Sequence, residues 1–340
     1  MLTPFFHAWE RRLASATTDR VVRPFEWGLD WLPENGAGRQ AAPEAYIAAW
    51  AAESLAASDR FFETPPTTDY ALDGDVLSFP SAYTTPHPAN NRVHARYFPA
   101  KIGRNGSGAP RAVVVLPQWN ADPKGHVALC RWLARCGISA LRLSLPYHDR
   151  RMPPELHRAD YIVSSNIVRT VQVCRQAVLD ARRAIAWLAG RGYGRIGMLG
   201  TSLGSCLAML TAAHEPRVRA AALNHISPYF ADVVWEGLST THVREGLDRA
   251  IALDRLRELW LPISPQPYIE RMKPKKALLV YARYDLSFPV RLSRALVDDF
   301  RRVGVDHEVV VLPCGHYSTG VAPFSWIDGY ALVRFLRRAL

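Results

Sequence analysis

The sequence contains no long apolar run. Across its 340 residues, no stretch reaches the roughly 18 consecutive apolar residues that a membrane-spanning helix needs. Its beginning places the charged residues after a short aromatic patch, whereas a secretory signal peptide has basic residues first and a longer apolar core behind them. These two absences predict a soluble, cytoplasmic protein with no membrane span.

Cysteine is scarce, and its spacing argues against both a disulfide framework and a metal-binding scaffold. The five cysteines are an odd number, and none belongs to a Cys-x-x-Cys pair or to a cluster with histidine. We therefore expect reduced, mostly buried thiols, with neither a disulfide framework nor a bound metal. The cysteines are Cys130, Cys136, Cys174, Cys206 and Cys314.

Lysine is also scarce, and most of the basic residues are arginine. Only 5 of the 42 basic residues are lysines, and the arginines are spread along the whole chain, often one per helical turn. The net charge of +11 raises nucleic-acid binding as an alternative. No basic run with interleaved aromatic residues is present, so we expect no nucleic-acid partner.

What the sequence does contain is a regular alternation of apolar strands and amphipathic helices. Strands are predicted at 112–116, 139–145, 195–201, 220–225, 277–281 and 307–312, and helices at 127–136, 165–188, 289–303 and 324–339, with a further helix after position 202. Repeated units of this kind predict an α/β fold: a mostly parallel sheet with helices on both faces and ligands at the carboxyl ends of its strands.

The remaining segments suggest how the chain is organised. Residues 1–68, with a helix at 43–62, are predicted to form an N-terminal helical extension that packs on a domain spanning 69–340. Two antiparallel edge strands are expected at 76–79 and 92–98, followed by a loop at 101–110. The insertion at about 226–276 is too long for a simple crossover, so we expect a small helical lid with a helix at 241–259.

The motif Gly-Thr-Ser-Leu-Gly at positions 200–204 lies between a predicted strand and a predicted helix. In such a turn the central Ser202 is forced into a strained conformation that presents its hydroxyl, and side chains at the two glycine positions would collide with the strand and the helix. The Leu203 N–H, at the start of that helix, would face the same spot and stabilise an oxyanion. We interpret Ser202 as a nucleophile.

Two further strand ends supply an acid and a base. Asp285 follows the strand predicted at 277–281, and His316 follows a glycine after the last predicted strand. A serine hydroxyl is a weak nucleophile at pH 7 unless an oriented base activates it, so a histidine and a carboxylate at the same sheet edge would complete the site. The chain order Ser202, Asp285, His316 is the one found when this triad is mounted on an α/β sheet.

On these residues the chain resembles the α/β-hydrolase superfamily of serine hydrolases over roughly residues 70–340. The resemblance implies that Ser202 attacks an acyl carbonyl, that His316 takes and returns the proton, and that Asp285 orients the imidazole. It also implies an oxyanion donor after the strand at 112–116, where relatives carry His-Gly and this chain has Pro-Gln-Trp. Trp119 occupies the expected donor position there, and Gln118 is the alternative.

Several other residues compete for these roles. Asp149 or Asp232 could replace Asp285, although surface or helix-start positions suit both better. Other residues could line the site or bind an anionic group, or could have only structural roles; these are His148, His225, His242, Arg150 and Arg151. The glycine pattern at 192–197 matches a dinucleotide motif but precedes its strand instead of following it, so no cofactor is predicted.

The sequence therefore predicts a serine esterase that cleaves a carboxylic ester through an acyl-Ser202 intermediate. Peptidase, thioesterase and acyltransferase activities use the same triad and stay open, as does a binding module without catalysis. Apolar side chains of the expected lid suggest a hydrophobic small-molecule acyl substrate; these are Trp235, Leu238, Trp260 and Tyr268.

Overall fold

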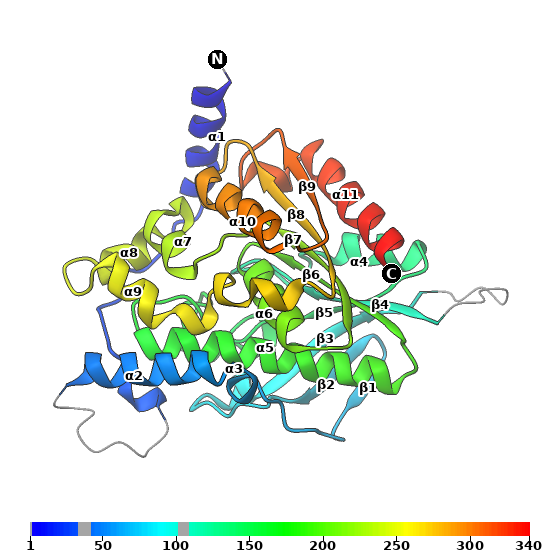
Figure 1. Ribbon diagram of the computed structural model, residues 1–340, viewed down its shortest axis with the longest axis horizontal. Coiled ribbons are helices and arrows are strands. Elements are labelled where there is room, and N and C mark those ends of the chain that lie inside the picture. Colours follow the sequence, from blue (N-terminus) through cyan, green and yellow to red (C-terminus); the bar gives the residue numbers. More distant parts are fainter. Residues whose placement is uncertain (1, 33–41, 101–108) are drawn as a thin grey trace.

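The centre of the molecule is a nine-stranded sheet, mostly parallel, in the order β1-β2-β3-β5-β4-β6-β7-β8-β9 (Figure 1). The computed structural model describes residues 2–32, 42–100 and 109–340, so that most of the loop predicted at 101–110 lies outside the described residues. The strands are β1 (Ala71–Asp73), β2 (Val76–Pro80), β3 (Arg92–Phe98), β4 (Arg111–Leu116), β5 (Ser139–Leu143), β6 (Arg195–Thr201), β7 (Val218–Asn224), β8 (Lys276–Ala282) and β9 (His307–Leu312).

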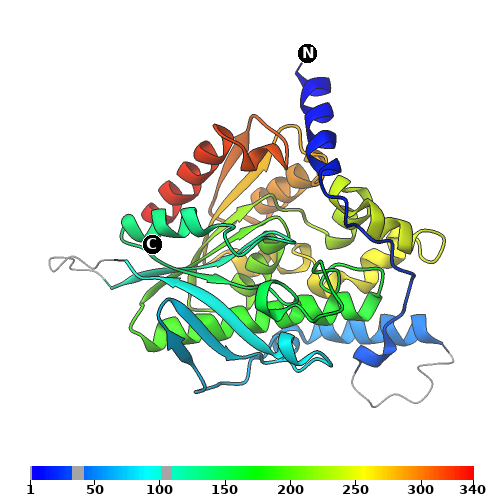
Figure 2. The ribbon, with the colours of Figure 1, turned by 180° about the vertical axis from the view of Figure 1, so that it is seen from behind.

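Helices cover both faces of this sheet, as predicted (Figures 1 and 2). One face packs against α5 (Ile167–Gly190), α6 (Leu203–His214) and α10 (Val290–Val303), and the other against α4 (Val127–Arg135) and α11 (Phe324–Ala339). Alternate residues of the central strands enter the two cores: Val114 faces the first set of helices, whereas Val113 and Val115 face the second. The β-branched run of β4 is buried on both faces for this reason.

The antiparallel part of the sheet is larger than predicted. β1 pairs with β2, β2 with β3, and β3 with β5, all antiparallel. The two strands predicted at the edge, 76–79 and 92–98, are therefore both inner strands, and the short β1, which the sequence analysis missed, forms the edge. Its three residues are all exposed, which leaves no alternation of apolar and polar residues to detect.

Two long predicted helices are broken. The helix predicted at 43–62 divides into α2 (Pro43–Ala56) and α3 (Ser58–Phe61) because the Ala57 backbone leaves the helical region, which turns Phe62 into the core. The helix predicted at 241–259 divides into α8 (Thr241–Leu247) and α9 (Leu253–Leu259), and Arg249 between them has a positive φ of 64°. Hydrophobic spacing continues across both breaks, so periodicity alone does not reveal them.

The insertion between β7 and β8 is helical and also contains α7 (Phe230–Glu236), which the sequence analysis missed.

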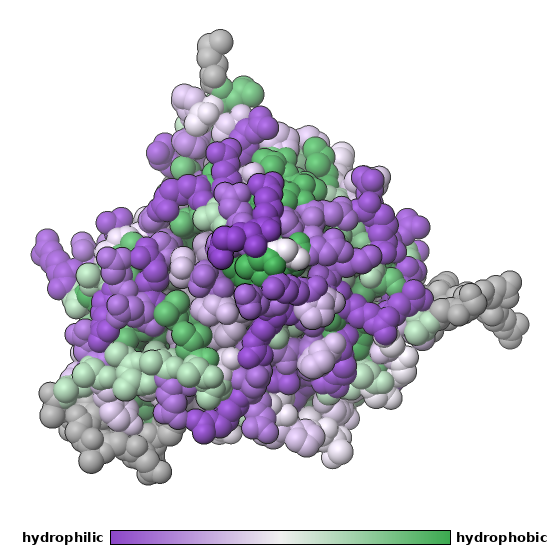
Figure 3. Space-filling model, viewed as in Figure 1, coloured by the Kyte–Doolittle hydropathy of each residue, from purple (hydrophilic) through white to green (hydrophobic). Residues whose placement is uncertain are grey.

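At the start of the chain, the N-terminal end of α1 (Thr3–Ser15) projects from the body of the molecule (Figures 1 and 2). Among the described residues, no helix has both the length and the apolar character needed to cross a membrane. Figure 3 shows hydrophilic side chains over most of one face, with smaller apolar areas between them.

Candidate active site

Ser202 occupies a strained turn between β6 and α6, with φ 56° and ψ −121°. A Cβ on Gly200 would lie 2.0 Å from the Gly204 carbonyl oxygen, and a Cβ on Gly204 would lie 2.2 Å from the Leu116 carbonyl oxygen. Both positions therefore require glycine, for the steric reason that the sequence analysis gave. The Ser202 N–H donates to the Asn224 carbonyl oxygen at 2.7 Å, which ties the turn to the end of β7.

Asp285 and His316 meet at the same edge of the sheet. The His316 Nδ1 lies 3.0 Å from Asp285 Oδ2, whereas Asp285 Oδ1 accepts the N–H groups of Ser287 and Phe288 at 2.8 and 2.7 Å. An ionised carboxylate only accepts hydrogen bonds, so the geometry assigns the proton of neutral His316 to Nδ1 and leaves Nε2 free to accept one.

His225 shares the same carboxylate oxygen. It follows β7 with a positive φ of 56°, and its Nδ1 lies 2.9 Å from Asp285 Oδ2. The imidazole rings of His225 and His316 lie 4.6 Å apart between centroids. The sequence analysis named His225 only as a residue that could line the site; its bond to Asp285 depends on the alignment of β7 with β8 and has no local sequence signal.

These contacts separate the pKa values of the two histidines. Burial lowers the pKa of His316, but the charge and hydrogen bond of Asp285, with a contribution from Glu10, outweigh it and raise the pKa above its usual value. Burial and the neighbouring His316 lower the pKa of His225, although Asp285 opposes them. Burial opposes ionisation of Asp285, yet the two histidines hold its pKa well below its usual value. Asp285 is therefore ionised at neutral pH.

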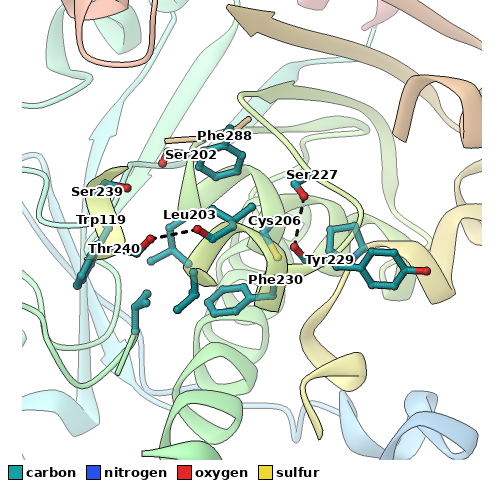
Figure 4. Close-up of a pocket in the computed structure, with 14 residues that line it drawn as sticks. Trp119, Ser202, Leu203, Cys206, Ser227, Tyr229, Phe230, Ser239, Thr240 and Phe288 are labelled. Atoms are coloured by element: carbon teal, nitrogen blue, oxygen red, sulfur yellow. Dashed lines mark hydrogen bonds between the residues drawn. The ribbon is translucent and has the colours of Figure 1, made fainter. Parts of the chain in front are cut away.

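An apolar pocket opens beside Ser202 (Figure 4). The pocket and its open mouth contain about 470 Å³ of empty space, and the lining residues come from α6, from the insertion and from the loops after β4, β5 and β8. Phe288 links the pocket to His316, because its ring stacks parallel to the imidazole at 5.3 Å. Ser202 itself is 9% exposed, so its hydroxyl is presented to this pocket and not to open solvent. The lining side chains include Val163, Cys206, Tyr229, Phe230, Val233, Val234 and Pro265.

The four apolar residues expected to contact a substrate lie elsewhere. Trp260 is fully buried and its indole N–H donates to the Ile167 carbonyl oxygen, whereas the buried Tyr268 hydroxyl donates to the Pro262 carbonyl oxygen. Neither these two residues nor Trp235 and Leu238 are among the described residues that line the pocket. The apolar lining of the pocket comes from other residues, because the insertion folds so that α7 faces Ser202.

The loop after β4 brings Trp119 to the pocket, whereas Gln118 is not among the lining residues. Two hydrogen bonds hold this loop against Ala159. The Trp119 indole N–H donates to the Ala159 carbonyl oxygen at 2.9 Å, and the Ala159 N–H donates to Asn120 Oδ1 at 2.8 Å. In the described part of the chain, neither Gln118 nor Trp119 donates a backbone hydrogen bond. Leu203 is the first residue of α6, where a backbone N–H has no partner within the helix.

The competing residues have structural partners instead. Asp149 accepts from Ser144 at 2.5 Å and pairs with Arg142, and Asp232 pairs with Arg257 at 2.8 Å. Neither therefore replaces Asp285. Arg151 is fully buried against Asp180 at 2.8 Å, whereas Arg150 is exposed.

Two of the histidines support the loop that carries Trp119. His148 Nε2 accepts the Asn120 N–H at 2.9 Å, which requires the neutral ring, and burial lowers the pKa of His148 to about 4. His242 stacks on the Trp119 indole at 5.7 Å, with the two rings nearly parallel. Both therefore act on the shape of the site from outside the pocket.

His225, Asp285 and His316 are also the one trio, among the residues that the structure describes, whose possible metal ligand atoms lie within 4.8 Å of one another. Two N–H···O hydrogen bonds to Asp285 Oδ2 account for this spacing. All five cysteines are free, and four of them are buried. Neither arrangement calls for a metal ion.

Comparisons with known proteins agree with this architecture. Residues 124–280 match the family model described as "Alpha/beta hydrolase domain containing 18". No curated protein matches the sequence at a significant level. Among solved structures, an acetyl xylan esterase from Paenibacillus sp. R4 superposes with a TM-score of 0.61 at 16% identity, over 92% of this chain and 98% of that protein. The chain has the α/β-hydrolase fold.

Two further structures share the α/β-hydrolase fold. Acetyl xylan esterase 1 from Thermoanaerobacterium sp. JW/SL YS485 gives a TM-score of 0.57 at 14% identity, over 96% of this chain and 98% of that one. The Pyrococcus horikoshii acylaminoacyl peptidase gives 0.58 at 13% identity over 73% of this chain, which spans only 40% of the peptidase. At such identities the likeness concerns the fold, and the chemistry must be argued from the site.

Proposed function

We propose that this protein is a serine hydrolase that cleaves a carboxylic ester through an acyl-enzyme intermediate. The observation that carries the proposal is the hydrogen bond from His316 to the buried Asp285, at the edge of the sheet where Ser202 occupies a strained turn beside an apolar pocket. A strained backbone, a buried ionised carboxylate and an oriented imidazole are each costly to maintain, and catalysis requires all three.

The reaction follows from the positions of the protons. His316 Nε2 accepts the proton of the Ser202 hydroxyl as Oγ attacks the acyl carbon, and Asp285 stabilises the imidazolium that forms. The protonated His316 then donates that proton to the leaving alkoxide. In the second half-reaction, His316 takes a proton from a water molecule that attacks the acyl carbon, and returns it to Ser202 Oγ as the carboxylic acid leaves.

The oxyanion formed in each step needs backbone donors. The Leu203 N–H at the start of α6 is one, and the Trp119 N–H is the second, with Gln118 as the alternative. Trp119 is favoured because its side chain lines the pocket and its loop is anchored at Ala159. A side-chain substitution does not remove a backbone N–H. The role of each amide is therefore tested through the effect on kcat of substitutions at neighbouring residues.

The pocket determines the acyl group. Its side chains carry no charge, which favours a hydrophobic small-molecule substrate. We further propose that residues 69–340 form the catalytic domain, that residues 1–68 are an extension packed on it, and that residues 226–276 act as a lid that excludes water. The free thiols are consistent with a reducing, cytoplasmic location.

The test combines covalent labelling with an ester panel. Intact-mass spectrometry after incubation with a fluorophosphonate should show one adduct on the wild-type protein and none on Ser202→Ala, and p-nitrophenyl esters from acetate to decanoate should be hydrolysed by the former alone. Peptide p-nitroanilides and thioesters, assayed beside them, distinguish ester hydrolysis from the related activities. A folded wild-type protein that forms no adduct and hydrolyses no ester would contradict the proposal.

A further inference from the structure

A buried carboxylate from the beginning of the chain contacts the loop that carries His316. Glu10, in α1, is 0% exposed, and three hydrogen-bond donors surround its carboxylate. The Tyr317 N–H donates to Oε2 at 2.8 Å, while the N–H and hydroxyl of Ser318 donate to Oε1 at 2.9 and 2.7 Å. Among the described residues, the hydrogen bonds of this carboxylate all go to the two residues that follow His316.

Gly315, on the other side of His316, is shaped to the same carboxylate. A Cβ at Gly315 would lie 2.3 to 2.5 Å from the Glu10 side chain, closer than atoms can approach. The Gly315 N–H donates to the Ser318 hydroxyl at 2.8 Å, which in turn donates to Glu10. The glycine before His316 thus has a physical reason in this chain: it admits the Glu10 carboxylate against the backbone of the loop.

The same helix also contacts the loop that carries Asp285. The Phe6 ring stacks on Tyr284 at 4.4 Å with an interplanar angle of 5°, and the Tyr284 N–H donates to the Cys314 carbonyl oxygen at 3.0 Å. One face of α1 therefore touches the residue before Asp285 and the residues after His316. A helix that is distant in sequence joins the two loops that must stay in register for the His316–Asp285 hydrogen bond.

We propose that Glu10 is a positioning residue for His316: its carboxylate, carried by α1, holds the loop Gly315 to Ser318 so that the imidazole faces both Asp285 and Ser202. This inference rests on the proposed function for its catalytic consequence, but the contact itself is independent of it. A displacement of about 1 Å of a catalytic group can cost on the order of 100-fold in rate, so a loosened loop should be visible in catalysis.

The charge of Glu10 adds a second effect. Ionisable groups close to His316 are Asp285, His225, Glu10 and Tyr317, whose ring lies 5.9 Å from the imidazole between centroids. Arg20 in turn donates to the Tyr317 hydroxyl at 3.0 Å. Burial lowers the pKa of His316, Asp285 raises it by more, and the Glu10 carboxylate adds a smaller upward contribution. Removing its charge should therefore move the acid limb of the pH-rate profile to lower pH.

The experiment compares four variants of the full chain. Glu10→Ala removes the acceptor, and Glu10→Gln keeps one oxygen but places an amide donor against one of the loop N–H groups. Gly315→Ala leaves Glu10 in place but adds a Cβ that displaces its carboxylate from the loop. The fourth variant combines Gly315→Ala with Glu10→Ala. The control is Glu53→Gln, whose carboxylate lies at the surface of α2, 68% exposed, and pairs with Arg60.

In the folded proteins, we expect both Glu10 variants to lower kcat for ester hydrolysis by about 10- to 100-fold with little change in KM, and Glu10→Gln to lower the midpoint of the acid limb. Gly315→Ala should cost a similar factor alone but add little to Glu10→Ala, because both remove the same contact. Glu53→Gln should match wild type in each measurement. A Glu10→Gln protein with wild-type kcat and an unmoved midpoint would overturn the proposal.

Hydrogen exchange makes the outcome independent of turnover. The Tyr317 and Ser318 amides should exchange faster in the Glu10 variants than in wild type, with the sheet amides unchanged. If folded wild type forms no fluorophosphonate adduct and hydrolyses no ester, the proposed function fails, yet faster exchange at these two amides would still support the contact. Unchanged exchange in a folded Glu10→Ala protein would overturn it, even if wild type is an active esterase.

Discussion

The two sides of the Ser202 site are built in opposite ways. On the polar side, Glu10, His225, Asp285 and His316 come from four distant parts of the chain, and hydrogen bonds at 2.7 to 3.0 Å connect them through Asp285 and the His316 loop. On the apolar side, the pocket wall comes largely from one insertion between β7 and β8, and its side chains meet through non-directional contacts.

This difference indicates how the two sides respond to change. A hydrogen-bonded network requires each partner in place, since one missing group leaves a buried polar atom unsatisfied. An apolar wall tolerates a change of shape at a cost proportional to the volume altered. We therefore expect substitutions on the polar side to affect the rate with all substrates, and those on the apolar side to affect the choice among substrates.

The largest effect is expected from Asp285→Asn. The asparagine oxygen can keep the Ser287 and Phe288 N–H bonds, which directs its NH₂ group toward both histidines. His316 Nδ1 must then accept a hydrogen bond from that group, which places the proton of the neutral ring on Nε2. A protonated Nε2 cannot accept the Ser202 proton. If the proposed roles are right, we expect kcat for ester hydrolysis to fall about 10⁴-fold, the loss known for the same substitution in an established serine triad.

Asp232→Asn is the matched control, because Asp232 was the competing acid and its carboxylate pairs with Arg257. Folded Asp232→Asn should keep near-wild-type kcat. The opposite ranking of the two variants would show that the acid has been assigned to the wrong strand.

The next effect is the pH dependence of the wild-type enzyme. In the proposed mechanism His316 acts as a base only when neutral, and its pKa is raised above the usual 6.5 by Asp285 despite burial. Activity should therefore be present above that raised pKa and should fall about 10-fold for each pH unit below it, hence about 100-fold over two units. The measurement is kcat/KM against pH. An acid limb with its midpoint below 6.5 would contradict the network described above.

A smaller effect is expected from His225→Leu, which removes one donor from Asp285 Oδ2 and leaves the other. A hydrogen bond to a charged group contributes about 1.5–3 kcal/mol. Because His316 keeps its own bond to Asp285, we expect the lower end of that range, and about 1.5 kcal/mol corresponds to a fall in kcat of about 10-fold. With one donor fewer, Asp285 should attract the His316 proton more strongly, and the acid limb should move to higher pH. That direction is opposite to the one expected for Glu10→Gln, so the two variants assayed together test the network from both ends.

The smallest effect is expected on the apolar side. Val234, in α7, is 2% exposed and lines the pocket. Val234→Phe should lower kcat/KM for p-nitrophenyl decanoate about 10-fold relative to the acetate, because one to three kcal/mol is typical for a pocket that loses room for part of an acyl chain. Val311→Phe, at an exposed position of β9, is the control. An equal loss with both esters would indicate general destabilisation and no role in selecting the acyl group.

Local patterns in the sequence were sufficient for the parallel part of the fold. Neighbouring residues decide the apolar runs at β4, β6 and β8 and the turn at Ser202, and the structure and the comparisons confirm the predicted architecture. The chain order of Ser202, Asp285 and His316 also followed from strand ends, because parallel strands bring their carboxyl ends to one edge. Their catalytic roles stay predictions until the labelling experiment is done.

The breaks in the helices and the composition of the pocket could not be predicted in the same way. Ala57 and Arg249 interrupt hydrophobic patterns that continue on both sides, and the choice of Val234 over Trp260 as a pocket residue depends on how the insertion packs. Such choices are made by contacts between elements, which the spacing of residues along one element does not record.

By itself, then, the sequence determined the strands of the parallel part of the sheet and the turn at Ser202, and it indicated that Ser202, Asp285 and His316 follow strands whose carboxyl ends share one edge. Only the tertiary structure decided that His225 shares Asp285 and that Glu10 reaches Tyr317, a residue 307 positions further along the chain. The physical reason is the range of the forces involved. Backbone geometry and hydrophobic periodicity act over a few neighbouring residues, whereas a buried carboxylate finds its donors only when packing brings distant segments together.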